Sequence, residues 1–207
     1  MIMFLTLVSG IAWCIVYEEC IRLAVKQKTY AMPFWALAAN ITWEGIYSIT
    51  GLSSSPDVQS IVNLLWFILD IVMLILFIQY AKKEWNPDLK SWTFYAWTIL
   101  GIVAMFFVQI AFIAQFGNAN HQAAQYSAFI QNLLMSILFI VMLGKRKSSK
   151  GQSMLLAVAK WIGTLAPTIT MGILSTNYVV LACGLFCTVY DVLYIVLLNR
   201  QIKLEKK

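Results

Sequence analysis

The sequence predicts an all-α, polytopic membrane protein with seven transmembrane helices, and its composition and segment lengths lead to that prediction. Hydrophobic residues make up 61% of the 207 residues and charged residues only 12%, with a mean hydropathy of +0.77. A soluble domain carries roughly 25% charged residues. Seven apolar segments approach the ~20 residues that a spanning helix needs. We therefore expect residues 1–207 to form a single seven-helix domain, with helices at about 2–17, 32–50, 60–81, 93–115, 124–144, 152–173 and 177–199.

Each predicted helix is bounded by charged or turn-forming residues. The first segment is followed by charged residues from Glu18 onward and lacks the charged start and small-residue cleavage site of a signal peptide, so we expect a retained helix. The second and fourth segments end near Ser53-Ser-Ser-Pro56 and Gly117-Asn-Ala-Asn120, which are typical of turns. Ser148-Ser-Lys-Gly151 separates the fifth segment from the sixth in the same way.

The distribution of positive charge predicts the orientation in the membrane. The net charge is +6, and the loops after the second, fourth and sixth segments contain no Lys or Arg. By the positive-inside rule, the N-terminus lies outside and the C-terminus in the cytoplasm of a multi-pass protein, which we expect in the cell membrane. Topology accounts for the charge, so no nucleic-acid partner is expected. The basic residues follow the first, third, fifth and seventh segments: Arg22, Lys26 and Lys28; Lys82, Lys83 and Lys90; Lys145, Arg146, Lys147 and Lys150; Arg200, Lys203, Lys206 and Lys207.

Cysteine and histidine give no indication of metal chemistry. Cys183 and Cys187 share one face of the last helix, where packing explains them, and the one histidine, His121, lies in an outside loop. We expect neither a metal site nor a cofactor.

Three carboxylic acids lie inside apolar segments, where water cannot solvate their charge. Glu44 is in the second segment, Asp70 in the third and Asp191 in the seventh. A charged residue at bilayer depth costs at least ~2.5 kcal/mol, so an intramembrane acid is a functional hypothesis by default. At ~1.5 Å of rise per residue from the cytoplasmic ends, the acids lie roughly 18, 16 and 12 Å deep. We expect all three to line one interior cavity.

Polar and aromatic residues share a helical face with each acid. Their spacing of three, four or seven residues places them beside the acid. Taken alone, such aromatic residues more often serve helix packing or interface belts, and the asparagines can serve as hydrogen bonds between helices. Lys160, in the sixth segment, is expected to snorkel or to pair with an acid. The candidate substrate-binding residues are Asn40, Trp43, Tyr47, Asn63, Trp66, Tyr190 and Tyr194.

Acids among aromatic rings suit one kind of chemistry. A carboxylic acid deprived of water stays protonated and can act as a general acid. Aromatic faces stabilise cations by up to ~2 kcal/mol or more when desolvated, and they exclude water that would quench a reactive intermediate. This combination is what a carbocation cyclisation initiated by protonation requires.

The chain resembles the integral membrane terpene cyclases of paxilline and pyripyropene biosynthesis. The resemblance covers the seven-helix layout and rests on Asn40-Ile-Thr-Trp43-Glu44, Trp66-Phe-Ile-Leu-Asp70 and Tyr190-Asp191. It implies that Glu44 and Asp191 are the essential acids, with a weaker match at Asp70. It also implies that a linear prenyl tail is cyclised by protonation of a terminal epoxide or alkene. At 207 residues the chain looks like a compact, bacterial-like member.

Two other function classes stay open at this point. A small transporter or channel, with a helix linking two parallel three-helix units, would use the acids to bind protons or substrate. A receptor or assembly protein would pair the acids with Lys160 and with amide side chains. The sequence contains no Asp-Asp-x-x-Asp run for diphosphate ionisation, no lysine in the apolar part of the seventh segment for a retinal Schiff base, and no Gly-x-Ser-x-Gly motif of a hydrolase.

Overall fold

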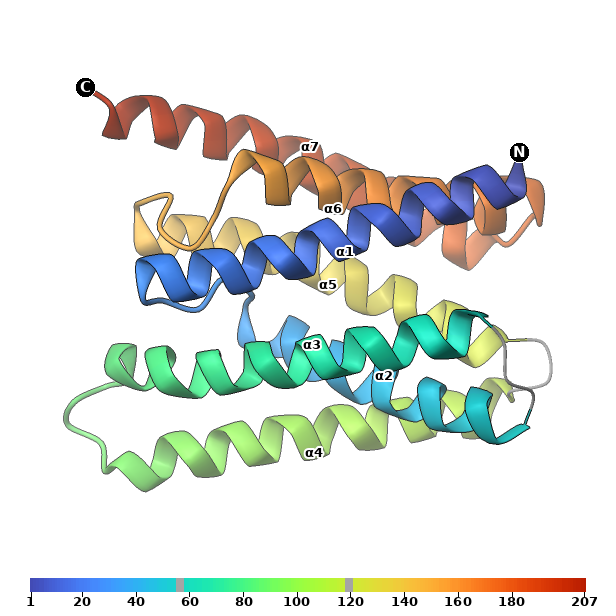
Figure 1. Ribbon diagram of the computed structural model, residues 1–207, viewed down its shortest axis with the longest axis horizontal. Helices are drawn as coiled ribbons and strands as arrows, with labels where there is room; N and C mark the ends of the chain where they lie inside the picture. Colours follow the sequence, from blue (N-terminus) through green and yellow to red (C-terminus); the bar gives the residue numbers. More distant parts are fainter. Residues whose placement is uncertain (55–57, 118–120) are drawn as a thin grey trace.

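The computed structural model describes residues 1–54, 58–117 and 121–207, and it confirms an all-α fold for these residues. The helices lie side by side along one direction, each antiparallel to the next in the chain (Figure 1). Their bounds are α1 Ile2–Gln27, α2 Phe34–Ser54, α3 Val58–Ala81, α4 Ser91–Phe116, α5 Gln122–Arg146, α6 Met154–Pro167 and α7 Tyr178–Glu205. A 3₁₀ turn, η1 Lys82–Glu84, follows α3, and a π-helical turn, η2 Thr168–Leu174, follows α6.

Three predicted boundaries are wrong: α7 continues to Glu205 instead of ending near residue 199, and the bounds of the first and sixth helices differ as follows. The first helix continues to Gln27 instead of ending near residue 17, because its charges are paired: Glu19 accepts hydrogen bonds from Arg22 and from Ser153 Oγ, the latter at 2.6 Å. The α-helical part of the sixth segment ends at Pro167, and a π-helical turn replaces the rest. Proline has no N–H to continue an α-helical ladder and its ring crowds the preceding turn. The turn expected at 148–151 is present, whereas those at 53–56 and 117–120 lie partly outside the described residues.

Six of the seven helices are long and apolar enough to cross a membrane. The exception among the described residues is α2, whose 21 residues include the buried polar side chains of Asn40, Thr42, Glu44 and Ser48. The helix that is not among the candidate spans is thus the one that carries the first candidate acid. A crossing by α2, and the orientation of the bundle, stay predictions.

The loops that carry the basic residues gather at one end of the bundle. The connections from α1 to α2, from α3 to α4 and from α5 to α6 lie at the same end as the C-terminus, and the N-terminus lies at the other (Figure 1). We call this the basic end. The alternation of charge along the chain therefore becomes a charge difference between the two ends of the molecule.

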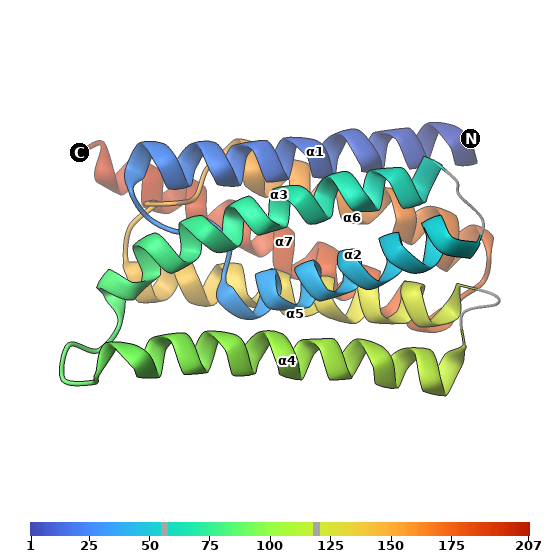
Figure 2. The same ribbon diagram turned by 60° about the horizontal axis from the view of Figure 1, so that its bottom comes forward.

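The helices of the transporter alternative's two three-helix units pack in the same way within each unit, with α3 against α1 and α2, and α7 against α5 and α6, and the two units also contact each other. The first helix packs closely along α6, where Ser9 Oγ donates to the carbonyl of Gly163 at 2.8 Å and Trp13 covers the same glycine. Small residues at such crossings let two backbones approach closely. α4 lies at the edge, against α2 and α5, and only 11% of its most apolar stretch is buried (Figure 2).

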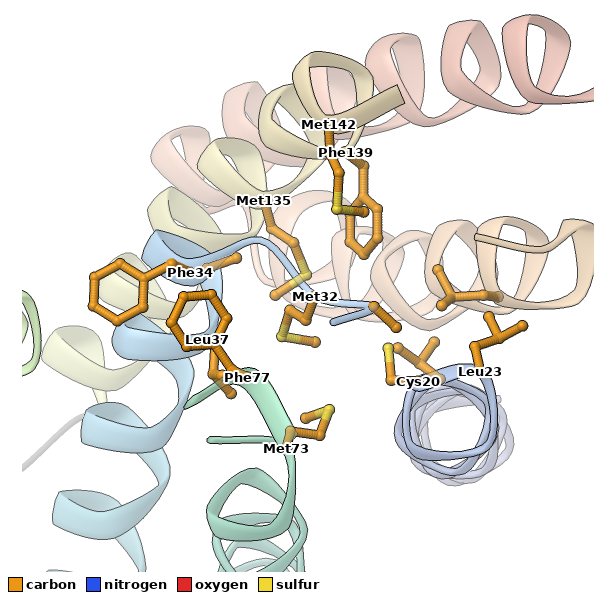
Figure 3. Packing of buried hydrophobic residues seen from close by; sticks show 14 of the residues in the cluster. Cys20, Leu23, Met32, Phe34, Leu37, Met73, Phe77, Met135, Phe139 and Met142 are labelled. Carbon is orange, nitrogen blue, oxygen red and sulfur yellow. The ribbon is translucent and has the colours of Figure 1, made fainter. Parts of the chain in front are cut away.

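The apolar core is rich in methionine and phenylalanine. Met32, Met73, Met135 and Met142 converge with Phe77 and Phe139 from several helices (Figure 3). Methionine is unbranched and adaptable, so its side chains can repack around a guest more readily than leucine or isoleucine.

Candidate active site

Glu44 is buried at the centre of the bundle and is held by a tyrosine of α1. Its side chain is 3% exposed, and Oε1 accepts a short hydrogen bond from the hydroxyl of Tyr17. Asn40, one turn before Glu44 on α2, donates from Nδ2 to the same hydroxyl at 2.9 Å. The i, i+4 spacing on α2 therefore brings both residues to Tyr17.

The hydrogen bonds around Glu44 form a chain in which every donor points toward the acid. Gln109 of α4 donates to Gln131 of α5 at 3.3 Å, and Gln131 donates to Asn40 Oδ1 at 3.2 Å. Asn40 then donates to Tyr17, and Tyr17 to Glu44 Oε1. With Oε1 engaged by Tyr17, Oε2 is the Glu44 oxygen left for an interaction with a neighbouring acid.

Asp70 lies beside Glu44, so two of the three predicted acids do meet. It is completely buried on α3, and its carboxyl group interacts directly with that of Glu44. Neither Asp70 oxygen nor Glu44 Oε2 has a well-formed hydrogen bond to another group among the described residues. Two adjacent carboxyl groups out of reach of water cannot both ionise, so they share at least one proton.

The third acid, Asp191, is in a different environment. Its two oxygens accept hydrogen bonds from Lys160 Nζ at 2.7 and 3.0 Å, and the same ammonium donates to Ser136 Oγ at 2.7 Å. Lys160 and Asp191 are 0% and 1% exposed at their side chains, so the pair is fully buried. Of the two roles predicted for Lys160, the structure shows the pairing with an acid and not the snorkelling. Asp191 is thus a paired carboxylate and does not join the hydrogen bonds around Glu44.

The predicted aromatic residues divide between the two acid groups. Trp66 of α3 stacks on the Tyr17 ring, with centroids 6.1 Å apart and an interplanar angle of 11°. Trp43 and Tyr47 of α2 pack on each other at 4.9 Å, and Trp43 Nε1 donates to the carbonyl of Ala124. Tyr194 lies near Asp191 and donates to Gln152 at 3.0 Å.

Two other predicted substrate-binding residues are less closely tied to the acids. Asn63 is buried on α3 and accepts from Gln59 at 2.8 Å, within its own helix. Tyr190 is only partly buried on α7.

Sequence reasoning missed Tyr17, Gln109 and Gln131, three of the residues that hold Glu44. Each is a polar side chain in an otherwise apolar helix, which is the same signal that singled out the acids. That signal is weaker for an amide or a phenol, because either can find a partner in any neighbouring helix. Which helices are neighbours is decided by tertiary packing.

The expectation that the three acids line one cavity does not hold for the cavity that lies between α1, α3 and α2, because none of the acids is among its lining residues, and this cavity is small. It has a volume of about 10 Å³ and is lined by α1, α3 and the segment that leads into α2, with Cys20, Met73 and Phe77 among its walls. Such a volume holds about one water molecule. Among the described residues, no three His, Cys, Asp or Glu side chains are grouped as metal ligands.

Comparison with known proteins identifies the family of this chain. The model of the Pyr4-like transmembrane terpene cyclase family matches residues 1–200. One relative is the terpene cyclase andB of Emericella variicolor, which is 31% identical over 79% of this chain and 68% of its own length. Another is the terpene cyclase pyr4 of Aspergillus fumigatus, which is 25% identical over 94% of this chain and 84% of its own length.

The match to other relatives is shorter. The Pyr4-family terpene cyclase mfmH of Annulohypoxylon moriforme is 28% identical over 78% of this chain. The matched part covers 66% of the length of mfmH, just under two thirds. The family match itself covers nearly all of the chain, helices and acids included. The chain belongs to the Pyr4-like transmembrane terpene cyclases.

Proposed function

We propose that this protein is a membrane-embedded terpene cyclase that protonates the terminal epoxide or alkene of a linear prenyl chain. The observation that carries the proposal is the geometry at Glu44: a buried carboxyl group whose Oε1 accepts from Tyr17 and which lies against the carboxyl group of Asp70. The substrate would be a terpenoid or a meroterpenoid. All seven helices would cross the membrane, with the basic end in the cytoplasm.

In the proposed reaction, Glu44 Oε2 gives its proton to the substrate, to the epoxide oxygen or to the terminal alkene carbon. The resulting carboxylate is stabilised by the hydrogen bond from Tyr17, which becomes charge-assisted once Glu44 is ionised. Ring closure moves the positive charge along the chain, and loss of a proton from the final cation returns one proton to the Glu44–Asp70 pair. Atoms and charge balance, and the product is an isomer of the substrate.

The aromatic and polar residues would shape the folded chain and stabilise its charge. Trp66 and Tyr17 present stacked rings beside the acid pair, and Trp43 and Tyr47 extend the aromatic wall along α2. Cation–aromatic attraction is strongest where water is excluded. Asn63 would limit how far the reactive end of the chain reaches past the acid pair on α3.

Asp191 enters the proposal as a fixed carboxylate and not as a proton donor. Lys160 holds both of its oxygens, so it would act on the developing cation by electrostatics from the α7 side. Tyr190 and Tyr194 would shape the substrate from the same helix.

Product analysis by mass spectrometry tests the function. Membranes containing the protein are incubated with linear prenyl compounds of increasing length, with and without a terminal epoxide, and membranes lacking it serve as the control. A cyclic product of unchanged mass, formed only with the protein, is expected. Substrate uptake into proteoliposomes without any conversion would instead support the transporter reading.

A further inference from the structure

An apolar seam runs from the acid pair toward the basic end of the bundle, between α1, α3 and the start of α2. The small cavity lies within it. The residues that line the cavity and define the seam here are Cys20, Ala24, Met32, Leu37, Met73 and Phe77.

The seam lies on the same helix faces as the candidate acid and its partners. On α1 and α3 the seam residues follow the site residue at i+3 and i+7, and on α2 Leu37 precedes Glu44 by two turns. Continuous stripes therefore join the acid pair to the seam. The stripes are Tyr17, Cys20 and Ala24 on α1; Glu44, Asn40 and Leu37 on α2; and Asp70, Met73 and Phe77 on α3.

The other side of the acid pair is polar. Toward the opposite end of the bundle, the buried residues of α2 and α3 include Ser48, Ser60 and Asn63, at 0%, 3% and 4% exposure. A hydrocarbon chain placed among them would compete with their hydrogen bonds and offer none in return. The acid pair therefore marks a boundary between an apolar half and a polar half of the interior.

The walls of the seam include adaptable methionine side chains. A ligand pocket has a volume of roughly 300 Å³ or more, far above the ~10 Å³ present here. Met32 and Met73 form part of the wall, and Met135 and Met142 lie behind Met32 (Figure 3). Unbranched thioether side chains can change rotamer to open such a space.

The seam ends at the surface of the basic end. Tyr30, in the segment between α1 and α2, closes it, and the guanidinium of Arg146 lies 4.1 Å from the centre of the Tyr30 ring. Arg146 also donates to the Tyr30 carbonyl at 2.9 Å. A polar head group attached to a chain in the seam would reach water and these donors at this point.

We propose that the prenyl chain binds in this seam, with its reactive terminus at Glu44 and its head group beside Tyr30 at the basic end. The proposal rests on the proposed function for the identity of the chain. It adds the binding path, the direction of the substrate, and Met73, Ala24 and Leu37 as residues that determine chain length.

Photo-crosslinking tests the path and the direction. Two linear prenyl alcohols are used, one with a diazirine near the terminal alkene and one with a diazirine next to the hydroxyl. We expect the first compound to label peptides containing Tyr17 or Asp70, and the second to label peptides containing Tyr30 or Phe77. An excess of the prenyl alcohol without a diazirine should remove both signals. The proposal would be overturned if the two compounds label each other's expected peptides, if the labels fall on α4, or if the prenyl alcohol without a diazirine does not reduce the labelling.

A matched pair of α3 variants gives an independent readout. Met73→Trp fills the seam, whereas Ile75→Trp places the same ring on an exposed position, since Ile75 is 59% exposed. We expect Met73→Trp to lower kcat/KM for the longest accepted chain by at least about tenfold and Ile75→Trp to leave it unchanged. If Met73→Trp does not fold, Met73→Ala replaces it and should shift the preference toward longer chains. Equal effects at both positions, or no change in chain preference with Met73→Ala, would overturn the proposal.

The two proposals fail in distinguishable ways. Labelling in the seam without any cyclic product would support the binding path and contradict the cyclase function. A cyclic product with labels outside the seam would support the cyclase function and contradict the binding path.

Discussion

Tyr17→Phe is the substitution that most selectively probes how Glu44 is held. It removes one hydroxyl, which donates to Glu44 Oε1 and accepts from Asn40 Nδ2 at 2.9 Å. The phenyl ring keeps the stacking contact with Trp66. The change therefore removes hydrogen bonds and leaves the shape of the site nearly intact.

The expected effect follows from what the hydroxyl stabilises. A hydrogen bond to a charged group is worth ~1.5–3 kcal/mol, and this one stabilises the carboxylate that Glu44 becomes when it protonates the substrate. At 1.36 kcal/mol per factor of ten, kcat should fall by roughly 10- to 150-fold, with KM little changed. The free energy of unfolding should also fall by ~1–3 kcal/mol, because Asn40 Nδ2 loses its acceptor.

Steady-state kinetics with a substrate found by the product screen measures the first effect, and thermal unfolding in detergent measures the second. Tyr126→Phe, at the ring contact between α4 and α5, is the matched control. If kcat of Tyr17→Phe stays within about twofold of the wild type while the protein remains folded, the assignment of Tyr17 to the proton donor is refuted.

Two further predictions concern stability. Lys160→Met leaves Asp191 buried without its partner, which should lower the free energy of unfolding by ~3–5 kcal/mol. The double variant Lys160→Met with Asp191→Asn should recover part of that loss in thermal unfolding. A double variant that is no more stable than Lys160→Met would contradict the pairing. Gly163→Leu should weaken the contact of α1 with α6, because a Cβ there would lie 3.0 Å from Trp13 Nε1. Gly10→Leu is its control, since a Cβ at that position meets nothing within 4 Å, and equal melting temperatures for the two variants would show that the crossing does not depend on Gly163.

The helical periodicity of the sequence was sufficient to place two of the acids together. Asp70 and Glu44 lie at similar depth on adjacent helices, and each faces inward because lipid cannot solvate it. Asp191 follows the same rule, yet its partner is Lys160. A single lysine toward the basic end of α6 could be interpreted from the sequence as a snorkelling residue or as the partner of an acid. Which one holds depends on how α6 packs against α7.

Residues from distant parts of the chain could not be assigned to the site from local patterns. Tyr17 reaches Glu44 because α1 packs beside α3, which in turn packs against α2, and Gln131 reaches Asn40 because α5 contacts α2. Likewise, α1 extends to Gln27 because Ser153, in the segment before α6, helps to pair Glu19. Each of these contacts follows from tertiary packing, on which hydrophobic periodicity carries no information.

Glu44→Gln tests the central claim most directly. Glutamine is nearly isosteric and keeps an acceptor for Tyr17, but its amide cannot donate a proton to an alkene or an epoxide. Glu18→Gln, at an exposed position on α1, is the matched control. We expect Glu44→Gln to lose cyclic product by a factor of about 10² to 10⁴ while it still inserts and folds, and Glu18→Gln to behave as the wild type. Cyclic product formed by Glu44→Gln at the wild-type rate would contradict the role of Glu44 as the proton donor.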